Sequence, residues 1–532
     1  MSLATNRISR RVRLASLGAA TALLVSSCGS SPENGEETQG GGTLVVAVSS
    51  EPPSLNPMTS QTLATWYVSN QILDTLITYD EDFEPVPSLA QSWEVSDDGT
   101  VYEFELVEGV TWHDGEPFSV DDVIYTFTEA GPEYSNTYDL VMGDLSSIEA
   151  TGENTIEFVF DEPVGAFMSY LGDPNFSILP QHIFEDAELA TDDANMAMIG
   201  TGPFKFADWD EGQQIRLERN DDYWDAGLPI ADELIFQVIS NPNTAVSALE
   251  SGEVDIALAM IPPVNAQELE QNDSIETTAP SVMARTLNLW FNLREEPFDD
   301  QLVREAINIA MDRPRMVDNI AFGQTDTARG PIGVTSPYFN ELLPEIDRDL
   351  DEAERLLDEA GYPLENGSRF ELSIRVSSNN DQFVSTAEII RENLADIGIA
   401  AQVDAAENTT TLDAIFGDWD FDVAVYSMPL GPEPALQLPA WLGEAGINNA
   451  YFSNAGGYIN EEVDELTAEA SRTVDPHERT AIYAEIQELI MEDLPLVPLW
   501  EPVFITGYSA DSVNPFPAPD DRYLRFVETG RE

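Results

Sequence analysis

The alternation of apolar and polar residues predicts a mixed α/β protein beginning near residue 43. Residues 43–48 (TLVVAV) form an unbroken apolar run, which is typical of a buried strand. Residues 100–106 alternate between apolar and acidic side chains, and the Asp-Asp-Gly sequence at 97–99 is typical of a hairpin turn. The segment 119–122 (SVDD) resembles a capping box that opens a helix. Further strands are expected at 155–160 and 234–239.

Between about residues 300 and 500 the pattern becomes a regular succession of helices and strands. Asp299 and Asp300 precede a helix whose apolar face includes Val303 and Ile307. The expected elements that follow are a helix at 351–360, a strand at 372–376, a helix at 384–397, a strand at 399–403, a short helix at 410–416 and a strand at 421–426. This spacing predicts parallel strands joined by helical crossovers. Two amphipathic helices, at about 461–473 and 477–493, close the region.

The first 42 residues are expected to direct export and attachment rather than to fold with the body. Basic residues precede an apolar run at 14–25 that is shorter than the ~20 residues a membrane span needs. The sequence Val25-Ser-Ser-Cys28 resembles a bacterial lipobox, so we expect a lipoprotein signal peptide at 1–27 and lipidation at Cys28. A plain secretory signal with an incidental cysteine is the alternative. Ser9-Arg10-Arg11 resembles a twin-arginine motif, which leaves the export route open between two pathways.

Residues 28–42, rich in Gly, Ser and Glu, are expected to form a flexible tether. A diacylglyceryl group on Cys28 would then anchor the body at the extracellular face of the cytoplasmic membrane, on the cell surface or in a periplasm.

The charge of the chain excludes some functions. There are 98 Asp and Glu residues and 23 Lys and Arg residues, which gives a formal charge of −75. A nucleic-acid partner is excluded because it requires a basic face, and docking of the body itself on anionic lipid is disfavoured.

Lys205 is the single lysine, so the surface resembles that of halophilic proteins; a GC-rich genome that prefers arginine is the alternative explanation. A single cysteine excludes an internal disulfide framework.

No pattern of catalytic residues stands out. The chain contains no GxSxG, P-loop or HExxH sequence, and Gly200-Thr-Gly202 is an isolated GxG. His113, His182 and His477 are scattered, so we expect structural or surface histidines rather than a metal site. Carboxylate pairs are uninformative among so many acids. We therefore expect no enzyme, no catalytic residues, no cofactor and no metal, with a secreted hydrolase as the alternative.

A series of motifs resembles the bacterial extracellular solute-binding proteins of family 5, the peptide/nickel-type binding components of ABC importers. In chain order the motifs are GTLVVAV (42–48), EPPSLNP (51–57), ILDTLI (72–77), VPSLAQSW (86–93), GVTWHDGEPF (109–118), GTGPFK (200–205), RNDDYW (219–224), LESGEVD (249–255) and FDDQLVREA (298–306). The resemblance extends over residues 43 to 530. Conspicuous motif residues such as Trp112 and Gly202 are expected to fix a subdomain and a crossover rather than to touch a ligand.

The resemblance implies a bilobed fold similar to periplasmic binding proteins (type II, large cluster C form) with an inserted small subdomain. The expected domains are lobe I at 43–78, 202–298 and 500–532, the inserted subdomain of lobe I at 79–201, and lobe II at 299–499. The lobes would close around a solute, and the closed form would dock on a permease of two transmembrane subunits with their ATPases. The resemblance further implies a monomer.

The same resemblance places the ligand contacts on four short segments. The expected ligand-binding residues are Gln61, Leu63, Trp290, Asn292, Tyr426, Ser427, Trp500 and Glu501. Each tryptophan has ordinary core packing as its alternative. Peptide binders of the family carry an aspartate shortly after the aromatic residue at 426, where it pairs with the ligand amine. This chain has none there; Glu433 matches the acidic-Pro position that follows and is a candidate structural residue.

The missing aspartate leaves the solute open. An oligopeptide is the first expectation, and an oligosaccharide or glycoside is the alternative. Opines and chelated metals remain as further classes, and bare nickel is disfavoured by the few histidines. A receptor that feeds a sensor rather than an importer is an alternative role.

Overall fold

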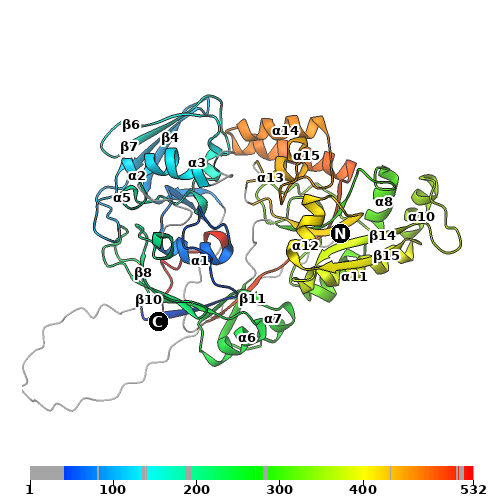
Figure 1. The fold of residues 1–532 in the computed structure, drawn as a ribbon, viewed down its shortest axis with the longest axis horizontal. Helices are drawn as coiled ribbons and strands as arrows, with labels where there is room; N and C mark the ends of the chain where they lie inside the picture. The colour runs from blue at the N-terminus through cyan, green and yellow to red at the C-terminus, as the bar shows by residue number, and fades with distance from the viewer. Residues whose placement is uncertain are drawn as a thin grey trace, which may run out of the picture. The chain divides into compact units, whose positions relative to one another are not determined.

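In the computed structural model the described residues are 41–80, 83–134, 138, 141–185, 193–269, 271–278, 285–431, 433–435, 437–510, 513 and 521–530. The predicted signal peptide at 1–27, the lipidation site Cys28 and the tether up to residue 40 lie outside them. Residues 40–532 form one compact unit. The fold is mixed α/β, as the sequence predicts, and it contains three principal sheets (Figure 1).

The first sheet has the strand order β12-β18-β11-β1-β10-β9-β8. Its strands are β1 (Thr43–Val48), β8 (Phe204–Asp210), β9 (Gln214–Arg219), β10 (Glu233–Val238), β11 (Ile256–Ile261), β12 (Ile275–Thr278) and β18 (Ile505–Ser509). The buried apolar run of β1 pairs in parallel with β10 and β11, while the outer pairs are antiparallel. Helices α1 (Leu63–Ile72), α6 (Pro242–Ser251) and α7 (Pro263–Leu269) belong to the same lobe.

The second sheet has the order β15-β14-β16-β13-β17. Its strands are β13 (Thr286–Phe291), β14 (Glu371–Ser377), β15 (Ala400–Ala406), β16 (Val423–Met428) and β17 (Leu496–Trp500). Its helices are α8 (Gln301–Ala310), α9 (Arg313–Met316), α10 (Leu350–Glu359), α11 (Asp381–Asp396), α12 (Asn408–Leu412), α13 (Gln437–Leu442), α14 (Glu461–Arg472) and α15 (Pro476–Asp493). The predicted parallel pairing is confirmed, because β14 pairs in parallel with both β15 and β16.

The boundary between the lobes differs from the sequence expectation at residues 286–298 and at Trp500, which was expected in lobe I but ends β17 of the second sheet. Lobe I was expected to include residues 286–298, but β13 pairs antiparallel with β16 and β17 inside the second sheet. All six residues of β13 are buried, so the strand completes the second core rather than the first. The chain therefore crosses to lobe II before β13 and returns to lobe I between β17 and β18.

An inserted four-stranded antiparallel sheet decorates lobe I. Its order is β4-β5-β7-β6, with strands β4 (Ala90–Val95), β5 (Val101–Leu106), β6 (Leu145–Ala150) and β7 (Thr155–Phe160). Helices α2 (Val120–Tyr125), α3 (Gly131–Tyr134) and α5 (Gln181–Phe184) accompany it, and a short pair, β2 (Ile77–Tyr79) and β3 (Pro85–Pro87), leads into it. The predicted hairpin forms β4 and β5, and Ser119 makes the predicted capping box of α2.

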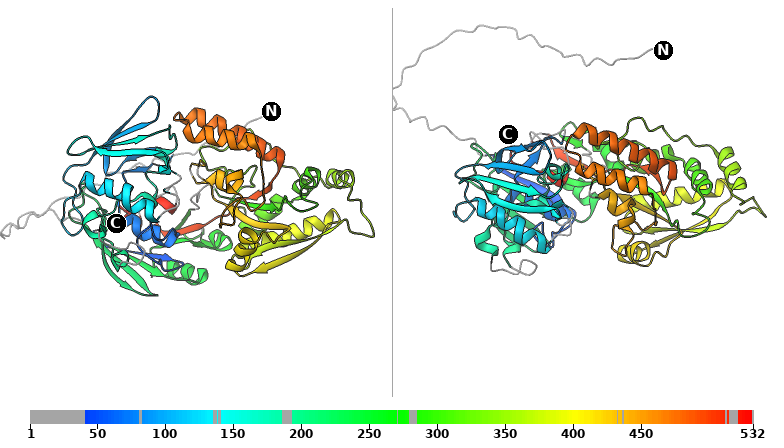
Figure 2. Two further views of the ribbon diagram at one scale, coloured as in Figure 1. Left: turned by 45° about the horizontal axis from the view of Figure 1, so that its top comes forward. Right: turned by 90° about the horizontal axis from the view of Figure 1, so that it is seen from above.

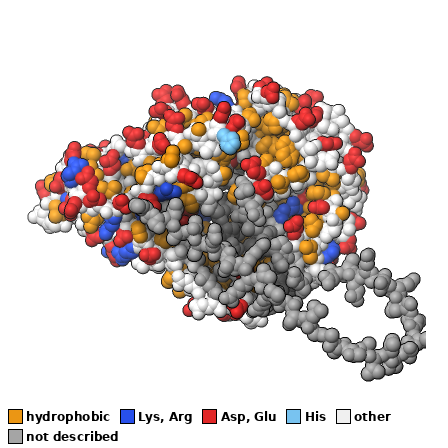
Figure 3. Space-filling view, turned by 180° about the vertical axis from the view of Figure 1, so that it is seen from behind, with side chains coloured by type: hydrophobic (Ala, Val, Ile, Leu, Met, Phe, Trp, Pro, Cys, Tyr) orange, Lys and Arg blue, Asp and Glu red, His pale blue; other side chains and the backbone are white. Residues whose placement is uncertain are grey.

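The helix pair α14–α15 lies at the side of lobe II that faces the inserted sheet (Figures 1 and 2). On the face shown in Figure 3, carboxylate side chains are spread over the described surface, and basic side chains are few among them. None of the helices in the described segments has both the length and the apolar character that crossing a bilayer requires.

Candidate functional site

A cavity of about 390 Å³ lies between the two lobes, within the range of about 300 to 1,000 Å³ that is usual for small-molecule sites. Lobe I and its inserted subdomain contribute Gln61, Leu63, Trp66, Ser169, Tyr170, Asp173, Asn175, Arg522 and Tyr523. Lobe II contributes Tyr426, Ser427, Pro429, Leu430, Gly431, Glu433, Gln437, Trp441 and Phe452, and Arg285 lies at the crossover before β13. We call this space the interlobe cavity.

Aromatic side chains form the lobe II wall of the interlobe cavity. Tyr426 and Trp441 are stacked with ring centroids 6.1 Å apart, and Phe452 lies 6.2 Å from each. On the opposite side Trp66 donates from Nε1 to Asn175 at 3.3 Å. Aromatic faces of this kind favour a flat or apolar part of a solute.

Charged groups inside the cavity contact other side chains. Arg522 forms an ion pair with Asp173, and its guanidinium lies 4.5 Å from the centroid of the Trp66 ring. Arg285 lies 5.5 Å from the centroid of Phe504. Burial raises the pKa of Tyr426 to about 12, although the positive charge of Arg285 acts in the opposite direction. The Tyr426 hydroxyl is therefore protonated at neutral pH and can donate a hydrogen bond to a solute.

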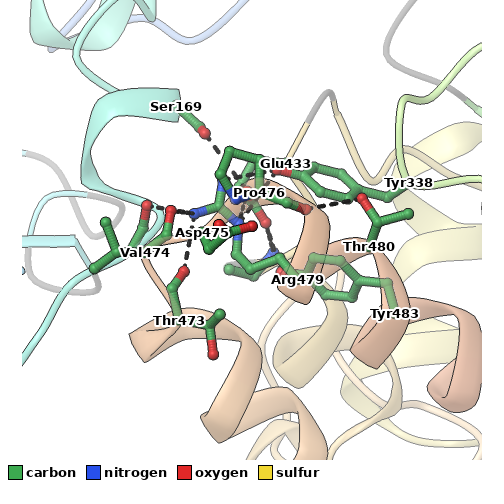
Figure 4. Close-up of polar contacts among 12 residues, drawn as sticks. Ser169, Tyr338, Glu433, Thr473, Val474, Asp475, Pro476, Arg479, Thr480 and Tyr483 are labelled. Carbon is green, nitrogen blue, oxygen red and sulfur yellow. Dashed lines mark hydrogen bonds and ion pairs between the residues drawn. The ribbon is translucent and has the colours of Figure 1, made fainter.

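Glu433 closes the cavity on the side of α15, and its carboxylate is fully engaged (Figure 4). Oε1 accepts hydrogen bonds from Tyr483 at 2.5 Å and from the amide of Ala435 at 3.2 Å. Oε2 lies 3.3 Å from Nε of Arg479 and 3.5 Å from the Ser169 hydroxyl. A solute ammonium would therefore meet a carboxylate that already has four donors. The structural role considered for Glu433 fits this arrangement.

Four of the eight predicted ligand-binding residues line the interlobe cavity: Gln61, Leu63, Tyr426 and Ser427. Gln61 and Leu63 flank Thr62, whose side chain caps the first turn of α1 by accepting from the amide of Thr65. Tyr426 and Ser427 lie near the end of β16. Contact with a solute at these positions stays a prediction.

The other four predicted residues lie outside the lining. Trp290 packs behind the wall, 5.5 Å from Trp441, and donates to the carbonyl of Tyr426 at 3.2 Å. Asn292 donates to the carbonyls of Trp419 and Phe421 at 3.2 and 3.1 Å.

The last two, from the end of β17 and just after it, are buried elsewhere. Trp500 is buried in the lobe II core and donates to Thr386 at 3.1 Å. Glu501 accepts from the amide of Val334 at 2.7 Å. These two residues join segments of lobe II to one another.

Several lining residues were not singled out from the sequence, among them Asp173, Asn175, Arg285, Trp441 and Arg522. The sequence contains one signal that could have indicated the two arginines as site residues. In a chain with 23 basic and 98 acidic residues, an arginine within or beside apolar residues is unusual. No three His, Cys, Asp or Glu side chains in the described part of the chain are grouped so that they could hold a metal ion.

Comparison with known proteins identifies the family. The model of the bacterial extracellular solute-binding proteins, family 5, matches residues 84–449, and the chain belongs to that family. Proteins of this family are extracytoplasmic substrate-binding receptors of ABC importers rather than enzymes.

Relatives of known name cover nearly the whole chain. The glutathione-binding protein GsiB of Escherichia coli O1:K1 / APEC is 28% identical over 97% of this chain and 98% of its own length. The oligopeptide-binding protein AppA of Bacillus subtilis (strain 168) is 28% identical over 90% of this chain and 89% of its own. The solved structure of the periplasmic binding protein DppA from Helicobacter pylori with the peptide STSA is 28% identical. It covers 93% of this chain and 99% of that protein, with a TM-score of 0.76.

Proposed function

We propose that this protein is the solute receptor of an ABC importer and that it holds an oligopeptide or a similar solute between its lobes. It delivers that solute to a permease of two transmembrane subunits with their ATPases. The observation that carries the proposal is the interlobe cavity, which both lobes line and whose walls combine aromatic faces with charged groups. Relatives named for glutathione and for oligopeptides support the solute class.

The lobe II wall favours a solute with an apolar or flat portion. Such a portion would lie against Tyr426, Trp441 and Phe452, and the protonated Tyr426 hydroxyl would donate to a carbonyl or carboxylate. Because Glu433 is engaged with Arg479 and Tyr483, it would not replace the aspartate with which peptide binders of the family pair the ligand amine.

Attachment to the membrane is a second part of the proposal. Cys28, preceded by Val25-Ser-Ser, would carry a diacylglyceryl group, and the tether at 28–42 would hold the body outside the cytoplasmic membrane. The receptor would work as a monomer. Metabolic labelling with a radioactive fatty acid tests the anchor: the native chain should be labelled, and Cys28→Ala should not.

The solute is tested first by native mass spectrometry. A protein that begins at Gly40, where the compact unit starts, is purified in molar salt without denaturant. A co-purified mass that fragments into amino acids supports the proposal. Hexose-spaced masses would replace the oligopeptide by an oligosaccharide, and a solute that is chemically converted would replace the receptor by a hydrolase.

A matched pair of variants tests the cavity itself. Peptides of two to nine residues are screened by calorimetry, and the tightest is carried forward. Tyr426→Ala should weaken its binding at least tenfold, because a buried aromatic anchor is worth about 2 kcal/mol or more. Tyr362→Ala removes a tyrosine that packs against Phe370, outside the cavity lining, and should leave binding unchanged. Equal binding by both variants, or no binding of any peptide by the parent, would contradict the proposal.

A further inference from the structure

A buried ion pair in lobe II lies beside the interlobe cavity. Glu433 follows β16, Arg479 belongs to α15, and their side chains are only 1% and 5% exposed. The guanidinium also donates to the hydroxyl of Tyr338 at 2.7 Å, and the hydroxyl of Tyr483 donates to Glu433. Two tyrosines thus fix the pair on its own lobe (Figure 4). A desolvated pair of this kind is favourable only when such additional hydrogen bonds satisfy it.

The same two residues reach across to the inserted subdomain of lobe I. Nη1 of Arg479 donates to the carbonyl of Gly165 at 2.6 Å. The hydroxyl of Tyr170 donates to the backbone carbonyl of Glu433 at 3.0 Å, and the Ser169 hydroxyl lies 3.5 Å from its carboxylate. One short segment, 165–170, therefore meets both members of the pair.

The backbone of Gly165 comes close to lobe II. A Cβ atom added at Gly165 would lie 1.9 Å from the carbonyl oxygen of Thr473, in the loop between α14 and α15. The three nearest heavy atoms all belong to Thr473 and Val474. Any side chain at residue 165 would therefore collide with the backbone of the other lobe.

This contact lies between two cavities. A second cavity of about 400 Å³, lined by Tyr79, Met168, Tyr338 and Arg479 among others, lies beyond it, and Ser169 lines both spaces. No part of the contact requires a solute atom. It therefore differs from contacts that a solute would make with each lobe, and its free energy is present whether the interlobe cavity is filled or empty.

We propose that Arg479 and Glu433, seated on the 165–170 segment, form a latch that holds the two lobes closed without a solute. The inference rests on the proposed function in taking lobe closure as the working motion of the receptor. A solute shifts a closing equilibrium only by its differential affinity for the closed form. A latch raises the closed population beforehand, so less of the solute's binding free energy is used for closure. In the latch the Glu433 carboxylate contacts Arg479 and Ser169 rather than a solute amine.

Single-molecule energy transfer on the solute-free protein tests the latch. The protein that begins at Gly40 lacks Cys28, so Glu153→Cys in the inserted subdomain and Glu354→Cys on α10 provide two exposed dye positions. The measurement is made in 1 M NaCl, where repulsion between the acidic lobes is screened. We expect the parent to show a majority high-efficiency, closed population. A parent that is mostly open without solute would overturn the latch.

Gly165→Ala is the decisive variant. The closed-to-open ratio should fall by about tenfold or more, because the added methyl group collides with the Thr473 backbone of the other lobe only when the lobes are closed. Gly417→Ala, where a Cβ atom meets nothing within 4 Å, is the control and should behave as the parent does. An unchanged distribution in Gly165→Ala would also overturn the proposal.

Arg479→Lys provides a second, independent variant. Lysine keeps a cation beside Glu433, but its single ammonium cannot reproduce the planar fork that reaches both Glu433 and Gly165. We expect opening in the same direction as in Gly165→Ala, with circular dichroism showing a folded protein. If Gly165→Ala does not fold, Arg479→Lys and Tyr170→Phe decide the question by the same readout. Failure of the proposed function would appear separately, as a receptor that is latched but binds no solute.

Discussion

The imidazole of His113 joins two segments of the chain that are far apart in sequence. Nε2 of His113 donates to the carbonyl of Gly202 at 2.9 Å, and the amide of Gly200 donates to Nδ1 at 3.2 Å. Because Nδ1 accepts a hydrogen bond, the ring is neutral and carries its proton on Nε2. The motif at 109–118 is thereby tied to the motif at 200–205, which agrees with a structural role for both.

This arrangement predicts a loss of stability in acid. Burial lowers the pKa of His113 to about 4, against 6.5 for a free histidine. Between these values the unfolded chain binds a proton that the folded protein does not. The contribution of His113 is therefore fully present above pH 6.5 and is lost as the pH falls to 4. The expected loss in the free energy of unfolding is about 3 kcal/mol.

Urea unfolding at several pH values measures this effect. His113→Gln should be less stable than the parent at pH 8, but the difference should shrink as the pH falls toward 4. His477→Gln, on an exposed residue at the start of α15, is the matched control. A parallel pH profile for parent and His113→Gln would show that the imidazole does not carry the dependence.

The close packing around Gly200 predicts that adding a single methyl group there strongly destabilises the folded protein. A Cβ atom there would lie 1.8 Å from the carbonyl oxygen of Ile72, and backbone atoms cannot swing aside as a side chain does. Gly200→Ala should lower the free energy of unfolding by about 3 kcal/mol or more. Gly417→Ala should change it by less than about 0.5 kcal/mol. If the two variants unfold at the same urea concentration, the close approach of Gly200 to the Ile72 carbonyl is contradicted.

Much of the fold could be predicted because its signals are local. The unbroken apolar run of β1, the Asp-Asp-Gly turn before β5 and the capping box at Ser119 each depend on a few neighbouring residues. The placement of β13 could not be predicted in this way. Its residues are buried on both faces, which suits a central strand of either sheet, and only the pairing with β16 and β17 decides between them.

The candidate site was predicted only in part, for a related reason. Tyr426 and Ser427 lie near the end of a recognisable strand, but Asp173 and Arg522 come from short irregular segments that meet only in the folded chain. The family resemblance places Trp500 at the solute, where the chain returns to lobe I. In the structure its indole is buried and donates to Thr386, so burial separates it from the cavity.

Glu501 predicts the opposite pH dependence from His113. Burial raises the pKa of Glu501 to about 7, against 4.5 for a free carboxyl group, although the amide of Val334 lowers it. Between pH 4.5 and 7 the folded protein binds a proton that the unfolded chain has lost, so stability falls as the pH rises through this range. The expected loss is about 3 kcal/mol above pH 7.

A glutamine at this position should remove that loss. The amide oxygen of Glu501→Gln can still accept from Val334, so the variant should match the parent near pH 4.5 and exceed it by about 3 kcal/mol at pH 8. Glu354→Gln on the surface of α10 gives the effect of losing one exposed carboxylate. If Glu501→Gln is destabilised equally at both pH values, the carboxyl group is charged in the folded protein and the prediction is wrong.

The charge of −75 predicts that salt stabilises this protein. Self-repulsion of the carboxylates falls as the Debye length shortens from about 14 Å at 0.05 M to about 3 Å at 1 M NaCl. The melting temperature of the protein beginning at Gly40 should therefore rise by several degrees over this range. Screening is nearly complete at 1 M, so a smaller rise should follow between 1 and 3 M. Molar sucrose at low salt is the control: a rise as large as that in NaCl, or a linear rise up to 3 M NaCl, would assign the effect to solute exclusion rather than to charge.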